Sequence, residues 1–194
     1  MGTSKMSGDA GSFFAKAVAA LHGVRLRPEI RLEEVPAPGR IAPYSLALTA
    51  DVISTQDGED ELASGRFVVL HDPTAPDPWD GVWRVVTFAR AALDPEMGTD
   101  PMLSDVGWSW LTDALAENGC AFTAPAGTVT TVLSQGYGSL SDNGASVDME
   151  VRASWTPTTD DLTTHLQAWT TLLCTIAGLP PLPEGVVALP GQRR

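Results

Sequence analysis

The sequence has few cysteines and no long apolar run, and both absences narrow the class of protein. Its two cysteines, Cys120 and Cys174, lie far apart and neither belongs to a CxxC pair. This excludes a disulfide framework and predicts two thiols buried as small hydrophobic residues. The chain lacks the roughly 20 consecutive apolar residues of a membrane span, and its first residues lack the apolar core of a signal peptide. We therefore expect a cytoplasmic protein that does not associate with a membrane.

Positive charge is also scarce. Lysine and arginine together number 12 against 24 aspartates and glutamates, which gives a formal net charge of −12 at pH 7. A negative field of this size repels phosphate backbones and anionic lipid surfaces, so nucleic-acid binding is not expected. Only Lys5 and Lys16 are lysines, and the other basic residues are arginines. That bias, together with abundant alanine, glycine and proline, indicates a genome of high GC content.

Catalytic motifs are missing as well. The sequence contains no GxSxG, no phosphate-binding glycine loop followed by lysine, and no HExxH. The histidines His22, His71 and His165 do not have the spacing of metal ligands. His71-Asp72 is compatible with a general base, although a strand that runs into a turn often carries such a pair by chance. We predict no cofactor and no metal site, and we rank an enzyme acting through His71 or His165 last.

Hydrophobic periodicity predicts most of the secondary structure. Helical spacing predicts helices over 12–22, from Ser104 or Asp105 to about residue 118, and from about 162 to 177. Alternating apolar and polar residues predict strands over 29–33, 44–52 and 67–71. The Asn143-Gly144 pair lies between two further alternating segments, 128–137 and 146–155, and predicts a hairpin. Thr158 and Asp161 resemble a capping box before the last helix.

Residues 82–93 allow two interpretations. The segment 82–88 is rich in β-branched and aromatic residues, as strands are, whereas 89–93 favours a helix. The apolar residues of the whole segment also fit a helical stripe. We predict a strand over 82–93 and keep the helix as the alternative.

The predicted order is helix, three strands, a fourth strand, helix, hairpin and helix. Strands with one apolar face, and few helices to cover that face, predict the α+β class. We expect a single domain over residues 11–182, with a mainly antiparallel sheet of five to six strands layered by about three helices. Residues 1–10 and 183–194 are expected to be disordered, flexible ends.

The six tryptophans divide into two groups. Trp79, in a loop rich in proline and aspartate, and Trp110, on the polar side of its helix, lack periodic apolar neighbours. They lie either partly buried under the proline-rich loop or on a surface for a partner or ligand. Trp110 points about 200° away from the tryptophan two positions before it. The other four are predicted to lie in the core: Trp83, Trp108, Trp155 and Trp169.

Two arginines, Arg84 and Arg90, are predicted to share one strand face with Val86 and Phe88. Ion pairs across a sheet explain such arginines. A less favoured interpretation is a pair of guanidinium groups that bind an anion.

Several motifs resemble those of a known family. They are RVVTFARAALDPEM at 84–97, DPML at 100–103, VGWSWL at 106–111, ASWTP at 153–157, HLQAW at 165–169 and LPP at 179–181. Through these motifs the chain resembles an actinobacterial domain-of-unknown-function family, number three thousand in its series. The resemblance extends over most of residues 12–187. The resemblance implies a cytoplasmic actinobacterial protein and assigns no role to any residue.

The element order is also similar to that of small acidic secretion-chaperone-like proteins, in which a helix, strands, helix, hairpin and terminal helix form a partner-binding dimer. This similarity concerns the fold alone.

Three functions are compatible with the sequence. The first is a non-enzymatic protein-interaction module, either a monomer or a homodimer, that holds a partner with Trp110, the loop around Trp79, and a sheet edge or helix face. The second binds a small apolar or anionic ligand in a pocket between the sheet and the tryptophan helix, where Arg84 or Arg90 meets a carboxylate or phosphate. The third is the histidine-dependent enzyme, for which His71 is the first candidate.

Overall fold

A computed structural model describes residues 3–54 and 60–181, and confirms the predicted α+β class and element order. The C-terminal segment expected to be flexible lies outside the described residues. The helices are α1 (Thr3–His22), α2 (Leu103–Glu117) and α3 (Thr163–Ile176). The strands are β1 (Ile30–Val35), β2 (Tyr44–Ile53), β3 (Glu61–His71), β4 (Trp83–Leu93), β5 (Phe122–Gln135) and β6 (Ala145–Pro157). Short 3-10 helices are η1 (Asp77–Trp79), η2 (Pro95–Thr99) and η3 (Gly138–Asn143).

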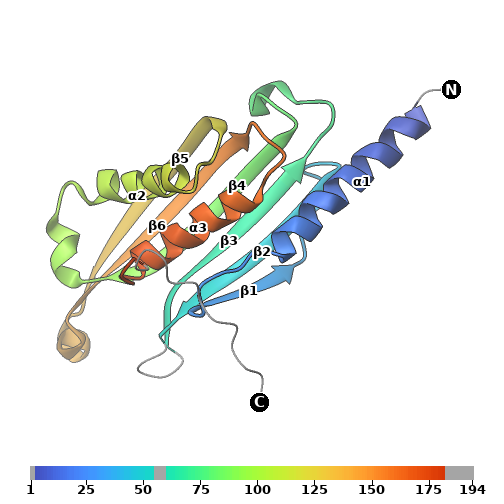
Figure 1. Ribbon diagram of the computed structural model, residues 1–194. Helices are drawn as coiled ribbons and strands as arrows, with labels where there is room; N and C mark the ends of the chain where they lie inside the picture. Colours follow the sequence, from blue (N-terminus) through green and yellow to red (C-terminus); the bar gives the residue numbers. More distant parts are fainter. Residues whose placement is uncertain (1–2, 55–59, 182–194) are drawn as a thin grey trace, which may run out of the picture.

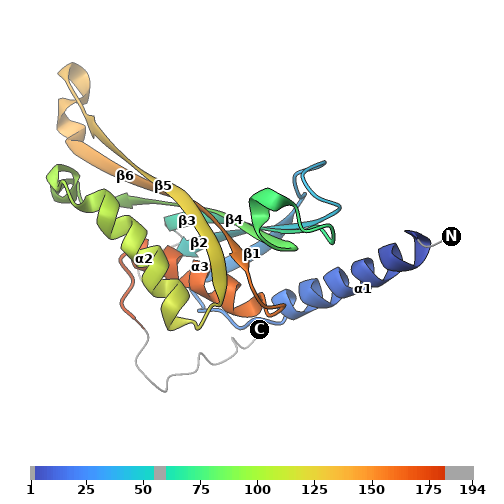
Figure 2. The ribbon, with the colours of Figure 1, turned by 90° about the horizontal axis from the view of Figure 1, so that it is seen from above.

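All six strands form one antiparallel sheet in the order β1-β2-β3-β4-β6-β5. The first four strands follow one another along the chain, and β6 then joins β4 so that β5 becomes an edge. The three helices lie on the same side of this sheet (Figures 1 and 2). The molecule therefore has two layers, and none of the described α-helices covers the second face of the sheet.

The ambiguous segment 82–93 is a strand throughout. β4 is a central strand, since β3 pairs with residues 83–91 and β6 with residues 85–93. Ala89 and Ala91 are buried in alternation with exposed neighbours, as a strand requires. Hydrogen bonding to two flanking strands outweighs the local helix preference of these alanines. The strand prediction is confirmed, and the helical alternative is wrong.

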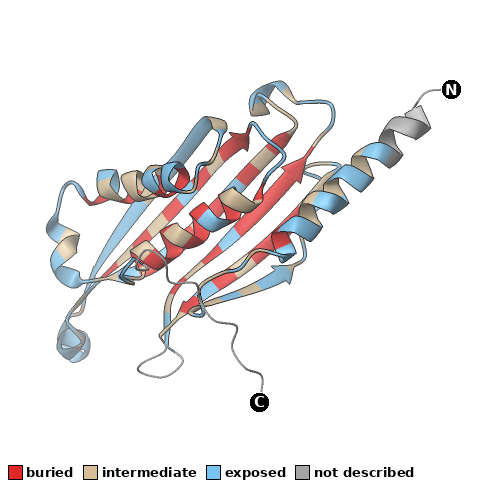
Figure 3. Cartoon of the chain, in the orientation of Figure 1, coloured by how far each residue is buried: buried red, intermediate tan, exposed pale blue. Residues whose placement is uncertain are grey.

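The core lies between the sheet and the helices, and the buried residues form a band along the central strands and α3 (Figure 3). Trp83, Trp155 and Trp169 are fully buried, as predicted. Trp169 lies over Gly65 of β3, where a Cβ atom would come within 2.8 Å of the indole ring and 2.4 Å of the Phe88 carbonyl oxygen. A residue without a side chain is thus needed for α3 to approach the sheet this closely.

Several element boundaries differ from the predictions. α1 begins at Thr3, so residues 3–10, which we expected to be disordered, are helical. The predicted hairpin is present, but η3 forms its end, so Asn143-Gly144 is not a two-residue turn. The predicted capping box before α3 is absent, because Leu162 occupies the cap position without a side-chain bond. The Asp161 carboxylate instead accepts a bond from the Thr163 amide at 3.0 Å.

The start of α2 also differs, since neither Ser104 nor Asp105 caps it. Met102 occupies the cap position without a side-chain bond, and the Asp100 carboxylate accepts from the Met102 amide at 2.8 Å. The predicted end is confirmed, with Asn118 as cap and Gly119 at a φ of 65°.

Candidate functional site

The face of the sheet opposite the helices is the candidate functional site, and we call it the open face. Strand register aligns its side chains in rows across the sheet. One row runs Thr49, Arg66, Phe88, Arg152 and Thr128 over β2, β3, β4, β6 and β5. The next runs Ala47, Val68, Val86, Ser154 and Ala126 over the same strands.

Phe88 lies between two arginines at the centre of this face. The Arg152 guanidinium carbon is 5.1 Å from the centre of the Phe88 ring, a distance at which a cation is attracted by an aromatic face. One Arg152 nitrogen also bonds the Glu150 carboxylate at 2.9 Å. Arg66, on the other side of Phe88, is exposed and has no ion-pair partner in the part of the chain that the structure describes. The centre of the open face therefore offers one apolar ring and a guanidinium without an internal counter-charge.

Arg84 and Arg90 share the open face with Val86 and Phe88, as predicted. Arg90 forms the expected ion pair across the sheet, with the Asp148 carboxylate at 3.1 Å. Arg84 does not, because its guanidinium bonds only uncharged acceptors. The acceptors are the Ala124 carbonyl at 3.0 Å and the Thr156 and Ser154 hydroxyls at 3.1 Å and 2.6 Å. Burial lowers the pKa of the Arg84 guanidinium.

Trp79 lies at one end of the open face. It is half-buried and contacts a small apolar cluster made by Ala47, Val68 and Leu70. The Trp79 carbonyl oxygen accepts a hydrogen bond from the Thr156 hydroxyl, which ties the proline-rich loop to β6. Trp79 therefore closes one end of the open face, in keeping with the burial alternative.

Trp108 and Trp110 flank the buried stripe of α2 from opposite sides. The stripe consists of Leu103, Gly107, Leu111, Ala114 and Leu115. Both tryptophans are half-buried and contact the core. Trp108 lies over β5, where a Cβ on Gly127 would meet its ring at 2.6 Å. Trp108 contacts the core as predicted but is only half-buried, and Trp110 is half-buried against the core and not exposed. Both lie at the rims of the stripe.

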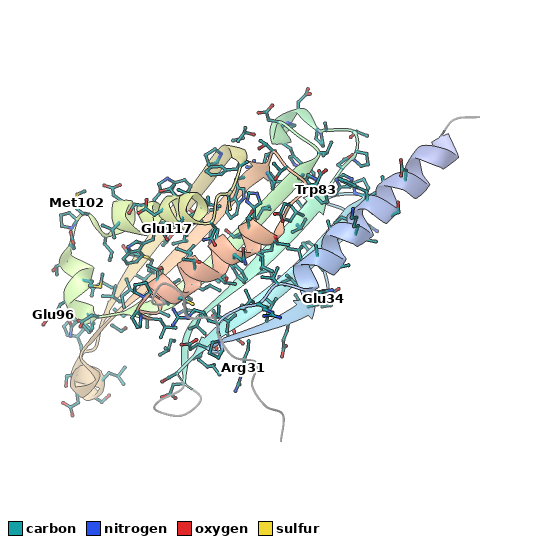
Figure 4. All side chains as sticks on the ribbon, in the orientation of Figure 1. Arg31, Glu34, Trp83, Glu96, Met102 and Glu117 are labelled. Carbon is teal, nitrogen blue, oxygen red and sulfur yellow. The ribbon has the colours of Figure 1, made fainter. Side chains whose placement is uncertain are left out.

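His71 is buried at the end of β3, on the helix side of the sheet, in a cluster of aromatic rings. The Trp83 ring centre is 4.3 Å from that of His71, and Phe13, Phe14 and Tyr44 lie within 6.3 Å. Burial lowers the pKa of His71, an effect that the Val82 backbone and the Asp72 carboxylate partly offset. Its Nδ1 atom has no hydrogen-bond partner among the described residues. Figure 4 labels Trp83 at this end of the sheet.

His165 is fully buried in α3 and accepts a hydrogen bond at Nδ1 from the Trp155 indole N–H at 3.0 Å. Burial lowers the pKa of His165 to about 4. The two histidines lie beneath the helices and apart from the open face, so the structure does not bring either of them together with Arg84 or Arg90.

The open face is hollowed only slightly. A depression of about 360 Å³ lies between β4, β6 and β5, and Val86, Gly127, Arg152 and Ser154 contribute to its lining. It is open to solvent, whereas small-molecule sites enclose most of their ligand. Arg84 and Arg90 lie on the opposite side of the sheet from α2. The predicted pocket between the sheet and the tryptophan helix therefore does not contain them, and that part of the ligand hypothesis is wrong.

Sequence reasoning missed Arg66, Phe88 and Arg152 as a group. The alternation in 146–155 already placed Arg152 on a polar face, but nothing local indicates that this strand pairs with β4. The row depends on which strands are neighbours, and the chain passes through α2 and β5 between them.

The described residues contain no group of three histidine, cysteine, aspartate or glutamate side chains that could hold a metal ion. No helix within 3–54 or 60–181 is long and apolar enough to cross a membrane. The cysteines are both free thiols. Cys174 is buried and Cys120 is half-buried.

The arrangement on the open face can bind carboxylate or phosphate groups and apolar side chains through its arginines and Phe88.

Residues 10–187 match the family model described as "Protein of unknown function (DUF3000)". The chain belongs to this family. No curated protein and no solved structure matches it. The DUF3000 match covers α2, the open face and all six strands, and assigns no activity to any of them.

Proposed function

We propose that the protein is a non-enzymatic interaction module that holds an acidic segment of a partner protein on its open face. The observation that carries this proposal is the row in which Arg66 and Arg152 flank Phe88, on a sheet face that no described α-helix covers. Val86, in the next row, is 39% exposed and widens the apolar centre. Aromatic and arginine side chains surrounded by small polar residues are typical of protein-binding surfaces.

The distribution of charge supports an acidic partner. Five of the ten arginines lie on the open face, although the chain as a whole has a net charge of −12. They are Arg31, Arg66, Arg84, Arg90 and Arg152. Asp148 and Glu150 neutralise Arg90 and Arg152 in part. Glu33 and Asp51 share the open face with Arg31, whereas Arg66 has no ion-pair partner among the described residues. The counter-charge for an acidic segment therefore lies at Arg66, beside Phe88.

An extended partner fits this face better than a small molecule does. The depression beside Arg152 is open to solvent and shallow, so a small ligand would remain largely hydrated. A protein segment laid across several strands can contact Val86, Phe88 and both flanking arginines at once.

The test is capture of partners from the cells that make the protein, with the wild type, the Arg66→Glu/Arg152→Glu variant and a control. Lys16→Glu/Arg25→Glu is the matched control, since it makes the same charge change at two exposed basic residues, one on α1 and one in the loop that follows it. A partner of the open face should bind the first variant roughly a hundredfold more weakly and bind the control normally. Equal binding to all three proteins would contradict the proposal. A small molecule found by native mass spectrometry, and lost with Arg152→Glu, would favour a ligand-binding function.

A further inference from the structure

The two edges of the sheet differ in length and in charge. β1 has six residues and carries Arg31, Glu33 and Glu34; Figure 4 labels Arg31 and Glu34 along this edge. β5 has fourteen residues and no charged side chain. The whole sequence between Glu117 and Asp142 is uncharged, in a chain with 36 charged residues counted as 12 basic plus 24 acidic. Charged residues on a short edge strand prevent unwanted strand pairing, and β5 lacks both protections.

The outer half of β5 also exposes apolar side chains on both faces of the sheet. Val132 is 48% exposed and Leu133 is 53% exposed, and consecutive residues of a strand point to opposite faces. Together with Tyr137 and Leu140 at the hairpin end, they make up four of the eight large hydrophobic residues that are exposed in the described part of the chain. This end of the β5–β6 hairpin projects beyond α2 (Figure 2). A further strand beside β5 would cover Val132 on one face and Leu133 on the other.

Such a strand must itself be uncharged, because β5 offers no counter-charge to a basic or acidic strand. The acids nearest to it on β6 are also neutralised, since Asp148 pairs with Arg90 and Glu150 with Arg152. Two copies of an acidic chain repel each other over most of their surface, and this uncharged edge is where that repulsion is weakest. Among the six described strands, one is long, uncharged and rich enough in β-branched residues to meet these requirements, and it is β5.

We infer that the outer half of β5 pairs antiparallel with the same segment of a second copy, so that two six-stranded sheets join into one. In the register that sets Val132 opposite itself, Thr131 faces Leu133 and Thr130 faces Ser134. No like charges then face each other, and threonine, serine and aliphatic pairs are favourable across antiparallel strands. The two-fold axis leaves the charged β1 edges at the two outer ends, so assembly stops at the dimer.

This inference does not depend on the proposed function, and its test needs no partner. Sedimentation of the wild type over about a hundredfold range of concentration should show a species of twice 20.5 kDa that dissociates on dilution. Val132→Lys places a charge at the two-fold axis, where it faces its own copy, and should be a folded monomer. Ile41→Lys is the matched control, because Ile41 is a 54% exposed apolar residue that lies off β5, and it should remain dimeric.

A cysteine pair tests the register. Opposite residues in antiparallel strands have Cα atoms about 4.5 to 5.5 Å apart, which suits a disulfide. In a Cys120→Ser background, Val132→Cys should therefore form a crosslinked dimer on mild oxidation, whereas Glu34→Cys on β1 should not.

Three results would overturn the inference: a wild type that stays monomeric at every concentration, a dimer that survives Val132→Lys, or equal crosslinking at Val132→Cys and Glu34→Cys. Arg66→Glu, which weakens the open face and keeps the Arg152–Glu150 pair intact, should leave the dimer mass unchanged. Loss of partner capture and loss of the dimer can thus be told apart.

Discussion

His165 is held in its neutral form by the packing around α3. The Trp155 indole donates to Nδ1, so the ring proton resides on Nε2, and burial lowers the pKa of His165 to about 4 from 6.5. The Asp161 carboxylate opposes this change only weakly, because burial is the larger cause. The side chain therefore acts as a hydrogen-bond acceptor in the core and not as a proton carrier.

Because the pKa of His165 is lowered in the folded chain, the free energy of unfolding should depend on pH. Between about pH 6.5 and about pH 4 the unfolded chain binds a proton at His165 that the folded chain excludes, so the free energy of unfolding falls as the pH falls. The loss contributed by His165 is about 3 kcal/mol over this window. We expect His165→Gln, which keeps an acceptor for Trp155, to show a shallower dependence in urea unfolding at a series of pH values. Parallel curves for the two proteins would show that His165 titrates normally in the folded state.

At the scale of the elements, the approach of α3 to the sheet depends on Gly65. A Cβ there would lie 2.4 Å from the Phe88 carbonyl oxygen, which belongs to the strand backbone and cannot move away without disturbing the β3–β4 pairing. We predict that Gly65→Ala lowers the free energy of unfolding by about 1 to 3 kcal/mol, as overpacking does. Chemical denaturation of the variant measures this.

Gly39→Ala is the matched control, because a Cβ at Gly39 meets no atom within 4 Å. It should leave the stability almost unchanged or raise it slightly. A Gly65→Ala variant as stable as this control would mean that α3 does not lie against β3 as described.

The elements also show what the sequence could and could not predict. Alternation and helical spacing were sufficient for the order of the elements, because β2 and β6 each have one dry and one wet side. They left a helix open for 82–93, where pairing with two neighbouring strands decides the conformation, and they failed for the end of the β5–β6 hairpin. The open face could be predicted only in part: Arg84, Val86, Phe88 and Arg90 follow from local alternation. Arg66 and Arg152 join them through strand order, which no local pattern contains.

At the scale of the whole molecule, acidic residues repel one another. Asp51 is an example, since burial and the nearby Glu61 and Glu33 carboxylates raise its pKa. Because added salt screens such repulsion, we predict that the thermal midpoint rises by several degrees between about 0.1 M and about 1 M sodium chloride. Differential scanning calorimetry measures this change. A falling midpoint would instead mean that ion pairs such as Arg27–Glu29 dominate the electrostatic free energy.

The tryptophans provide the molecule with an optical reporter. The indole N–H groups of Trp83, Trp155 and Trp169 are bonded internally, to Asp160, His165 and the Phe88 carbonyl, and these rings are sealed from solvent. Their fluorescence should be blue-shifted and resistant to acrylamide. The half-buried tryptophans, Trp79 at the open face and Trp108 and Trp110 on α2, should supply the quenchable, red-shifted part of the emission. Replacing these three one at a time with phenylalanine would assign each contribution, and titrations could then follow a partner at Trp79 and a second copy at Trp108 without any added dye.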